Sequence, residues 1–97
     1  MLRITPFDSD SEFVIKLEGC LCGPWVPELA AFWIDAATAQ PDRTIRVELE
    51  DVAHVDKAGR ELMTLMYRTG VRFAAKGFFM PEIVREIAET VRTGRRS

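Results

Sequence analysis

Three stretches of the chain place apolar residues at every second position, which is the pattern of a strand with one buried face. They run from Phe13 to Glu18, from Thr44 to Leu49 and from Val71 to Ala75. A shorter alternation begins at Leu2 and Ile4 and is followed by the polar turn Asp8-Ser9-Asp10-Ser11. The short connection predicts an antiparallel hairpin between the first two strands.

Apolar residues at helical spacing predict three helices. The first begins within Pro24–Pro27, because proline is tolerated only in the first turn, and it is broken at Pro41-Asp42. Its apolar face is Trp25, Leu29, Phe32, Trp33 and Ala36, and we interpret the two tryptophans as core residues rather than a ligand platform. The second helix runs from about Lys57 to Thr69. Gly70 follows as a left-handed C-cap with Val71 as its hydrophobic partner. The third helix follows Pro81 and ends at Gly94.

The order of elements predicts an α/β fold with a small mixed sheet of about four strands. Strands separated by helices are expected to be parallel, with right-handed crossovers. A parallel sheet covered on both faces would read as continuous apolar runs, whereas these strands place Lys16, Glu18, Arg46, Glu48 and Arg72 on one face. We therefore expect a mostly parallel sheet with all helices on the other face.

Length and charge place the chain among single soluble domains. Its 97 residues predict one domain over 1–97, with residues 95–97 as a frayed tail. A net charge of −2 with interspersed acids and bases gives no electrostatic footprint for nucleic acid. The chain contains neither an apolar run of membrane-spanning length nor a signal-peptide core, so we expect a cytoplasmic protein.

The two cysteines, Cys20 and Cys22, are separated by a single residue. This spacing is poorly suited to an unstrained disulfide, so we expect small, partly buried thiols. A tetrahedral metal site would need two more ligands, and His54 is the sole histidine. We therefore predict neither a metal site nor a redox role for the two cysteines.

No catalytic arrangement is evident in the sequence. A nucleophile elbow, a phosphate-binding loop and a Gly-x-Gly-x-x-Gly motif are all absent, so we expect no enzymatic activity and no cofactor. The most informative stretch is the junction after the third strand. There Asp56 is placed to cap the second helix, and Gly59 stands in its first turn at a cost of roughly 1 kcal/mol relative to alanine. Such a cost indicates a position where another backbone or a partner comes close.

The run Val55-Asp56-Lys57-Ala58-Gly59 resembles the central motif of STAS domains, which are found in anti-sigma factor antagonists and on sulphate transporters. That motif is a hydrophobic strand followed by Asp-Ser-Ser/Ala-Gly and an amphipathic helix. The upstream stretch from Leu17 to Val26 resembles the family's strand that ends in Leu-x-Gly-x-Leu and leads into a helix. The resemblance implies a superhelix of strands and helices, in a minimal form because the family commonly continues with another strand and helix.

The resemblance also implies a bacterial-type, regulatory, protein-binding function in signalling or transcription control. In anti-sigma factor antagonists a partner kinase phosphorylates a serine just before the motif's glycine, and the added charge releases the partner. Here that position is Ala58, so no phosphorylation is expected and binding would be constitutive. Lys57 also departs from the usual small hydroxyl residue. The implied partner is an anti-sigma factor kinase or another signalling or transporter component. The implied partner-binding residues are Asp56, Lys57, Ala58, Gly59 and Arg60 with Leu21, Cys22 and Gly23 of the loop Gly19–Gly23.

Two other interpretations remain open. The domain could be a self-associating structural module, a homodimer for example, that uses the open sheet face or the triplet Phe78-Phe79-Met80. Alternatively, the helix N-termini near Gly23 and Asp56 could bind an anion such as a nucleotide. Asp56 opposes this, because its carboxylate already occupies one helix end, so we expect a nucleotide to bind weakly or not at all.

Overall fold

The computed structural model describes residues 1–9, 11–75 and 79–94. Its elements, in chain order, are β1 (Leu2–Asp8), β2 (Glu12–Leu21), α1 (Trp25–Ala39), β3 (Thr44–Val55), α2 (Lys57–Arg68), β4 (Arg72–Ala75) and α3 (Phe79–Gly94). Residues 76–78, which include Phe78 of the triplet named above, and the predicted tail at 95–97 lie outside the described residues.

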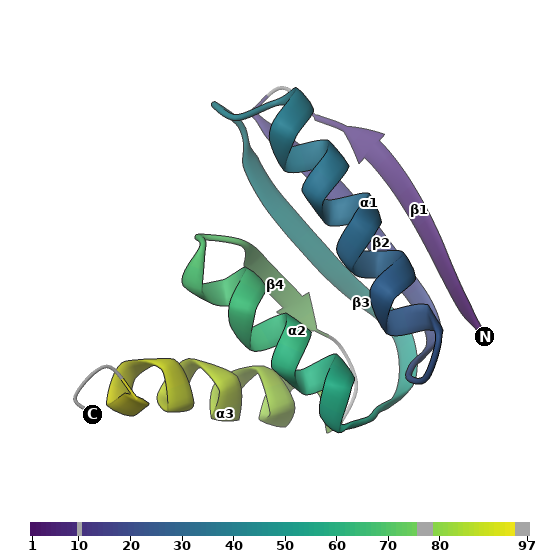
Figure 1. Ribbon diagram of the computed structural model, residues 1–97, viewed down its shortest axis with the longest axis vertical. Helices are drawn as coiled ribbons and strands as arrows, with labels where there is room; N and C mark the ends of the chain where they lie inside the picture. Colours follow the sequence, from purple (N-terminus) through teal and green to yellow (C-terminus); the bar gives the residue numbers. More distant parts are fainter. Residues whose placement is uncertain (10, 76–78, 95–97) are drawn as a thin grey trace.

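The strands form one sheet in the order β1-β2-β3-β4. β1 is antiparallel to β2, whereas β2, β3 and β4 are mutually parallel. α1 and α2 lie over the same face of the sheet, and α3 packs beside α2 and β4 (Figure 1). The predicted α/β class, with a small, mostly parallel mixed sheet and its helices on one face, is confirmed.

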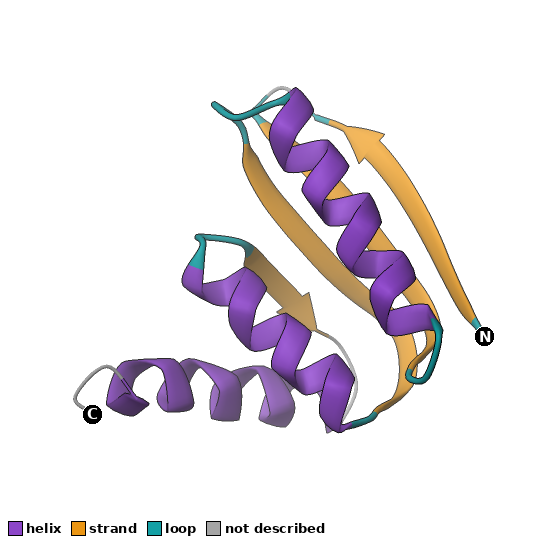
Figure 2. Ribbon diagram, in the orientation of Figure 1, coloured by secondary structure: helices purple, strands orange, loops and turns teal. Residues whose placement is uncertain are grey.

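The core lies between the sheet and the helices (Figure 2). Its most deeply buried strand residues include those that the alternation assigned to one face, Ile15, Leu17, Val47 and Leu49, together with Leu21 at the end of β2. The helices contribute Leu29 and Trp33 of α1, Leu62, Met63 and Met66 of α2, and Ile87 of α3. The hydrophobic effect therefore fixes which face of the sheet each helix covers.

The opposite face of the sheet is charged and partly solvated. Arg46 forms ion pairs with Glu48 at 2.8 Å and with Glu12 at 3.8 Å. Val14 lies on this face and is only 2% exposed, but it is not part of the core cluster. We attribute its burial to the long stems of neighbouring charged side chains, which cover apolar surface while their charges stay in water.

Two strands extend further than the sequence pattern indicates. β2 continues through Gly19 to Leu21, and β3 continues from Leu49 to Val55, so the predicted loop Gly19–Gly23 is wrong in its first half. Irregularities after Leu17 and after Gly19 shift the register of the pair and interrupt the period of two. Gly19 has a φ of 111°, and a Cβ there would lie 2.2 Å from the Met1 carbonyl oxygen, so only glycine fits this bend.

The predicted C-terminus of α2 is confirmed in detail. Gly70 has a φ of 102°. The Val71 N–H donates to the Met66 carbonyl at 3.1 Å, and the Gly70 N–H donates to the Tyr67 carbonyl at 3.1 Å. This pair of bonds is a Schellman motif, which satisfies the last carbonyls of the helix. It turns the chain directly into β4.

Among the described residues, no helix is both long and apolar enough to cross a membrane.

The two faces of β2 give a direct test of this arrangement. Leu17→Ala should lower the free energy of unfolding by roughly 2–5 kcal/mol, because Leu17 is fully buried beneath the helices. Its neighbour Lys16 points to the charged face, so Lys16→Thr should change the stability by less than about 0.5 kcal/mol. Urea denaturation of both variants measures the difference, and equal losses would contradict the assignment of the faces.

Candidate functional site

The carboxylate of Asp56 joins the two segments that the sequence marked as partner-binding. One oxygen accepts a hydrogen bond from the Gly59 N–H at 2.8 Å, which caps the first turn of α2. The other oxygen accepts a hydrogen bond from the Gly23 N–H at 2.9 Å, and Gly23 lies in the loop that follows the neighbouring strand β2. The Asp56 N–H in turn donates to the Leu21 carbonyl at 3.1 Å. The β2–α1 loop and the start of α2 are therefore one unit.

These contacts also shift the acidity of the side chain. The N–H groups of Gly23 and Gly59 donate to the carboxylate and hold the pKa of Asp56 below its ordinary value of 3.8, with a smaller contribution from the charge of His54. The ionised form is the one that these donors stabilise. The carboxylate thereby occupies the N–H groups at this helix end that an anionic ligand would need.

Gly59 is required by the close approach of α2 to β2. A Cβ at this position would lie 2.6 Å from the Leu21 carbonyl oxygen and 2.9 Å from Cγ1 of Val55. The backbone of α2 can reach the end of β2 only because no side chain intervenes. The expectation that this glycine marks a close backbone contact is confirmed.

The predicted site residues divide into an exposed group and a supporting group. Lys57, Ala58 and Arg60 are exposed on the first turn of α2, and Gly23 is exposed in the loop. Leu21 is fully buried and Gly59 is also buried, so these two shape the surface from beneath.

A hollow of about 580 Å³ extends the exposed surface toward α3. Arg60, which lines the hollow, pairs through its guanidinium with Glu86 of α3 at 2.7 Å. Ile87, which is otherwise buried in the core, contributes to the floor. The hollow is lined by His54, Val55, Asp56, Lys57, Arg60, Glu61, Thr64, Ile87 and Thr90. The contribution of α3 was missed by the sequence analysis, because only the packing of α2 against α3 brings Glu86 to Arg60.

The two cysteines are joined, which corrects the expectation of free thiols. Cys20 and Cys22 form a disulfide with a Cα–Cα distance of 5.5 Å. Cys20 is the penultimate residue of β2, and Cys22 is the first residue after the strand. The expectation of free thiols rested on the separation of the two cysteines by a single residue. The change from strand to turn at Leu21 instead brings the two side chains within bonding distance.

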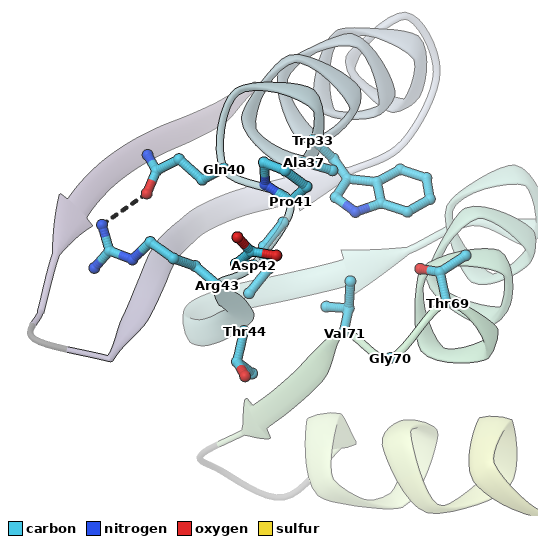
Figure 3. A pocket seen from close by; sticks show the side chains of 11 residues that line it. Trp33, Ala37, Gln40, Pro41, Asp42, Arg43, Thr44, Thr69, Gly70 and Val71 are labelled. Atoms are coloured by element: carbon cyan, nitrogen blue, oxygen red, sulfur yellow. Dashed lines mark hydrogen bonds between the residues drawn. The ribbon is translucent and has the colours of Figure 1, made fainter.

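A second hollow, of about 480 Å³, lies at the other end of the molecule, between the C-terminal ends of α1 and α2. Figure 3 shows the Trp33 ring beside it, with Val71 and Thr69 opposite and Asp42 at one side. The Arg43 guanidinium turns away from it and bonds to Gln40 at 2.6 Å (Figure 3) and to the Glu12 carbonyl at 2.8 Å. None of the predicted partner-binding residues lines this hollow.

The residues around Asp56 do not form a metal-binding set. Across the described ranges, no group of three or more His, Cys, Asp or Glu side chains is placed to hold a metal ion. The exposed groups of the first α2 turn are two cations and a methyl group, which suit contact with another protein surface.

No protein-family model matches the chain, and no curated protein matches it. Among solved structures it is similar to the crystal structure of Mglu in its L-glutamate binding form in the presence of 4.3 M NaCl. The match has 17% sequence identity and a TM-score of 0.46, and it covers 81% of this chain. The match covers 27% of the Mglu chain. The binding of L-glutamate is a property of Mglu.

The close approach at Gly59 predicts an unusual response to alanine. Gly59→Ala should lower the free energy of unfolding by roughly 1–3 kcal/mol, because the new Cβ overlaps the Leu21 carbonyl. In an unhindered helix the same change would raise stability by about 1 kcal/mol. Denaturant unfolding measures the sign. Lys57→Ala, in the same turn but exposed, is the control and should stay within about 0.5 kcal/mol of the parent.

The lowered pKa of Asp56 predicts a pH-dependent effect of Asp56→Asn. The folded-state pKa lies below the unfolded value of 3.8, so the stabilisation by ionised Asp56 is fully present above that pH and is lost as the pH falls through the folded pKa. The variant should therefore melt below the parent at neutral pH, and the gap should narrow in acid.

Calorimetric melting temperatures between about pH 7 and pH 2 measure this gap. Asp42→Asn, in the exposed loop before β3, removes the same charge at the far end and should melt close to the parent at neutral pH. A gap between Asp56→Asn and the parent that stays constant to the lowest pH would contradict the role of the carboxylate.

Proposed function

We propose that this protein is a non-enzymatic binding module of STAS type that docks a protein partner in regulatory signalling of the anti-sigma factor antagonist kind. The docking face consists of the exposed residues Gly23, Lys57, Ala58 and Arg60, together with the adjoining rim of the hollow toward α3. The partner is an anti-sigma factor kinase or another signalling component, and the protein acts in the cytoplasm.

The observation that supports this proposal is the bridging of both segments by Asp56. The carboxylate bonds Gly23 at 2.9 Å and Gly59 at 2.8 Å. Two segments that are separated by more than thirty residues in the sequence are thus held in one fixed arrangement. A prearranged surface of this kind lowers the cost of ordering that binding otherwise incurs.

The chemistry of the face favours docking over catalysis. Lys57 and Arg60 supply positive charge, and the Arg60–Glu86 pair is nearly half exposed on both sides, so a partner can compete for either member. Arg60 therefore offers an ionic contact whose net contribution depends on the desolvation that docking brings.

Ala58 sets the regulatory character of the face. It is exposed in the first turn of α2, at the position where the family resemblance expects a phosphorylated serine. Alanine carries no hydroxyl, so this position stays unphosphorylated and the surface stays in its binding-competent form. The proposal is therefore constitutive docking at this position.

The alternatives to this function are a self-associating module and a subunit of a transporter complex. On the open sheet face, Phe7 is 58% exposed, but it is surrounded by charged strand residues such as Arg46 and Lys16. A single exposed aromatic ring is common on monomer surfaces and gives self-association little support. Of the triplet proposed as a second interface, Phe78 and the side chains of Phe79 and Met80 lie outside the described residues.

The first experiment identifies the partner. Tagged protein is purified from its native cells, and copurified proteins and modifications are identified by mass spectrometry. A signalling kinase that binds the purified protein directly supports the proposal. Recovery of a transporter component would support a protein-binding module that acts in a different pathway. Recovery of the protein alone, or only with copies of itself, would support the structural alternative.

The docking face then predicts a matched set of variants. Ala58→Glu should weaken binding to the purified partner at least about tenfold, because it places a desolvated carboxylate in the contact. Ala58→Ser adds no charge and should bind nearly as the parent does. Lys57→Ala and Arg60→Ala should each weaken binding, whereas Asp42→Ala, in the loop at the opposite end, should not.

Titration calorimetry measures the affinity of the parent and of each of the five variants, and circular dichroism checks that each variant is folded. Parental affinity in Ala58→Glu, Lys57→Ala and Arg60→Ala together would overturn the assignment of the face.

A further inference from the structure

We propose that the Cys20–Cys22 disulfide is a thiol–disulfide exchange site that controls the loop end of the docking face, with a dithiol as its reductant. The consequence for partner binding rests on the proposed function. The exchange chemistry and its effect on the loop do not, and both can be measured on the protein alone.

The disulfide lies directly beside the contacts that build the docking face. It encloses the single residue Leu21, which is fully buried and whose carbonyl accepts the Asp56 N–H at 3.1 Å. The next residue after the disulfide is Gly23, whose N–H bonds the Asp56 carboxylate at 2.9 Å. The sulfur–sulfur bond therefore restrains the chain between a fixed core residue and an exposed site residue.

The disulfide contributes little to holding the fold together. Its cysteines are two positions apart, and the stabilisation from a crosslink grows with the length of the loop that it closes. Leu21 is fixed independently by burial and by its hydrogen bond to Asp56. Opening the disulfide should therefore leave the core intact, which distinguishes this bond from structural disulfides that close long loops.

Both cysteines are partly exposed, so a reductant can reach a sulfur. A thiolate of the dithiol attacks one sulfur and breaks the protein S–S bond, forming a mixed disulfide and releasing one protein thiolate. The second thiol of the reagent then displaces the other protein sulfur and closes a disulfide within the reagent. Two electrons and two protons pass to the protein, and the products are the Cys20 and Cys22 thiols. The chain has no third cysteine with which these could exchange.

Reduction should act on Cys22 and Gly23 in particular. Two non-bonded sulfur atoms cannot remain at bonding distance, so the Cys22 side chain must move away from Cys20. Gly23 has a φ of 57°, and a Cβ there would meet no atom within 4 Å, so the residue has open space around it on that side. Its carbonyl accepts the Val26 N–H at 3.2 Å, which ties the loop to the start of α1 but not to Asp56. The hydrogen bond from the Gly23 N–H to Asp56 is then the contact that weakens, whereas the Gly59 bond to the same carboxylate remains.

The experiment compares oxidised and dithiothreitol-reduced protein by amide hydrogen exchange, observed by NMR. Alkylation and mass spectrometry count the thiols in each sample. We expect reversible conversion between zero and two thiols per chain and a loss of protection of about tenfold at the Gly23 amide, which corresponds to losing one hydrogen bond. The Gly59 and Val47 amides are internal controls and should change less than about twofold.

The double variant Cys20→Ser/Cys22→Ser mimics the reduced form. It should exchange like reduced protein and should not respond to dithiothreitol. Should this variant fail to fold, reduced parent protein provides the same comparison. Equal protection of Gly23 in both redox states, parallel loss of protection at Val47, or failure of dithiothreitol to release two thiols would each overturn the proposal.

A second arm separates this inference from the proposed function. With the purified partner, the oxidised form should bind about tenfold more tightly than the reduced form, because its loop is prearranged. Equal affinities, with a changed Gly23 amide, would overturn the control of docking. Normal binding by Ala58→Glu, Lys57→Ala and Arg60→Ala would instead overturn the assignment of the docking face and leave the hydrogen-exchange result intact.

Discussion

The close approach of the first turn of α2 to the last residues of β2 is the constraint on which the rest of the structure depends. Gly59 permits it, because any Cβ would collide with the Leu21 carbonyl. Asp56 then holds it, by accepting the N–H groups of Gly59 and Gly23 while donating its own N–H to Leu21. This contact sets the position of α2 over the sheet and also of the loop that begins α1.

The same contact explains why the exposed surface at this end of the sheet is prearranged. Backbone groups that a ligand might otherwise bind are already satisfied by the Asp56 carboxylate. What remains outward is a small set of side chains on a rigid helix turn, with Arg60 linked to Glu86 of α3. In the proposed function, this rigid, mixed-charge surface is the part of the protein that contacts the partner.

The disulfide adds a chemically reactive bond beside this surface. It joins Cys20 and Cys22 at the point where the chain leaves β2, next to the residue that reaches Asp56. For the cytoplasmic location that we propose, such a bond would be transient and responsive to the redox state. The proposed docking face would then respond to thiol chemistry although Ala58 leaves no hydroxyl for phosphorylation at the motif position.

Local patterns in the sequence were sufficient to predict the order of the elements, the solvated and buried faces of the sheet, and the caps of α2. Alternation assigns Leu17 and Lys16 to opposite faces, Asp56 and Gly70 cap one helix, and the cost of Gly59 indicates a close contact. These features depend on residues within a few positions of one another. The family resemblance also predicted that the two proposed partner-binding segments are neighbours in the structure.

Features that depend on contacts between distant parts of the chain became visible in the three-dimensional structure alone. The extension of β2 to Leu21 required the bend at Gly19 against Met1, which breaks the period of two. The pairing of Cys20 with Cys22 depends on the turn that begins at Leu21, and the pair Arg60–Glu86 depends on how α3 packs. Backbone bends and long-range packing leave no regular spacing in the sequence, and for that reason these contacts could be found only in three dimensions.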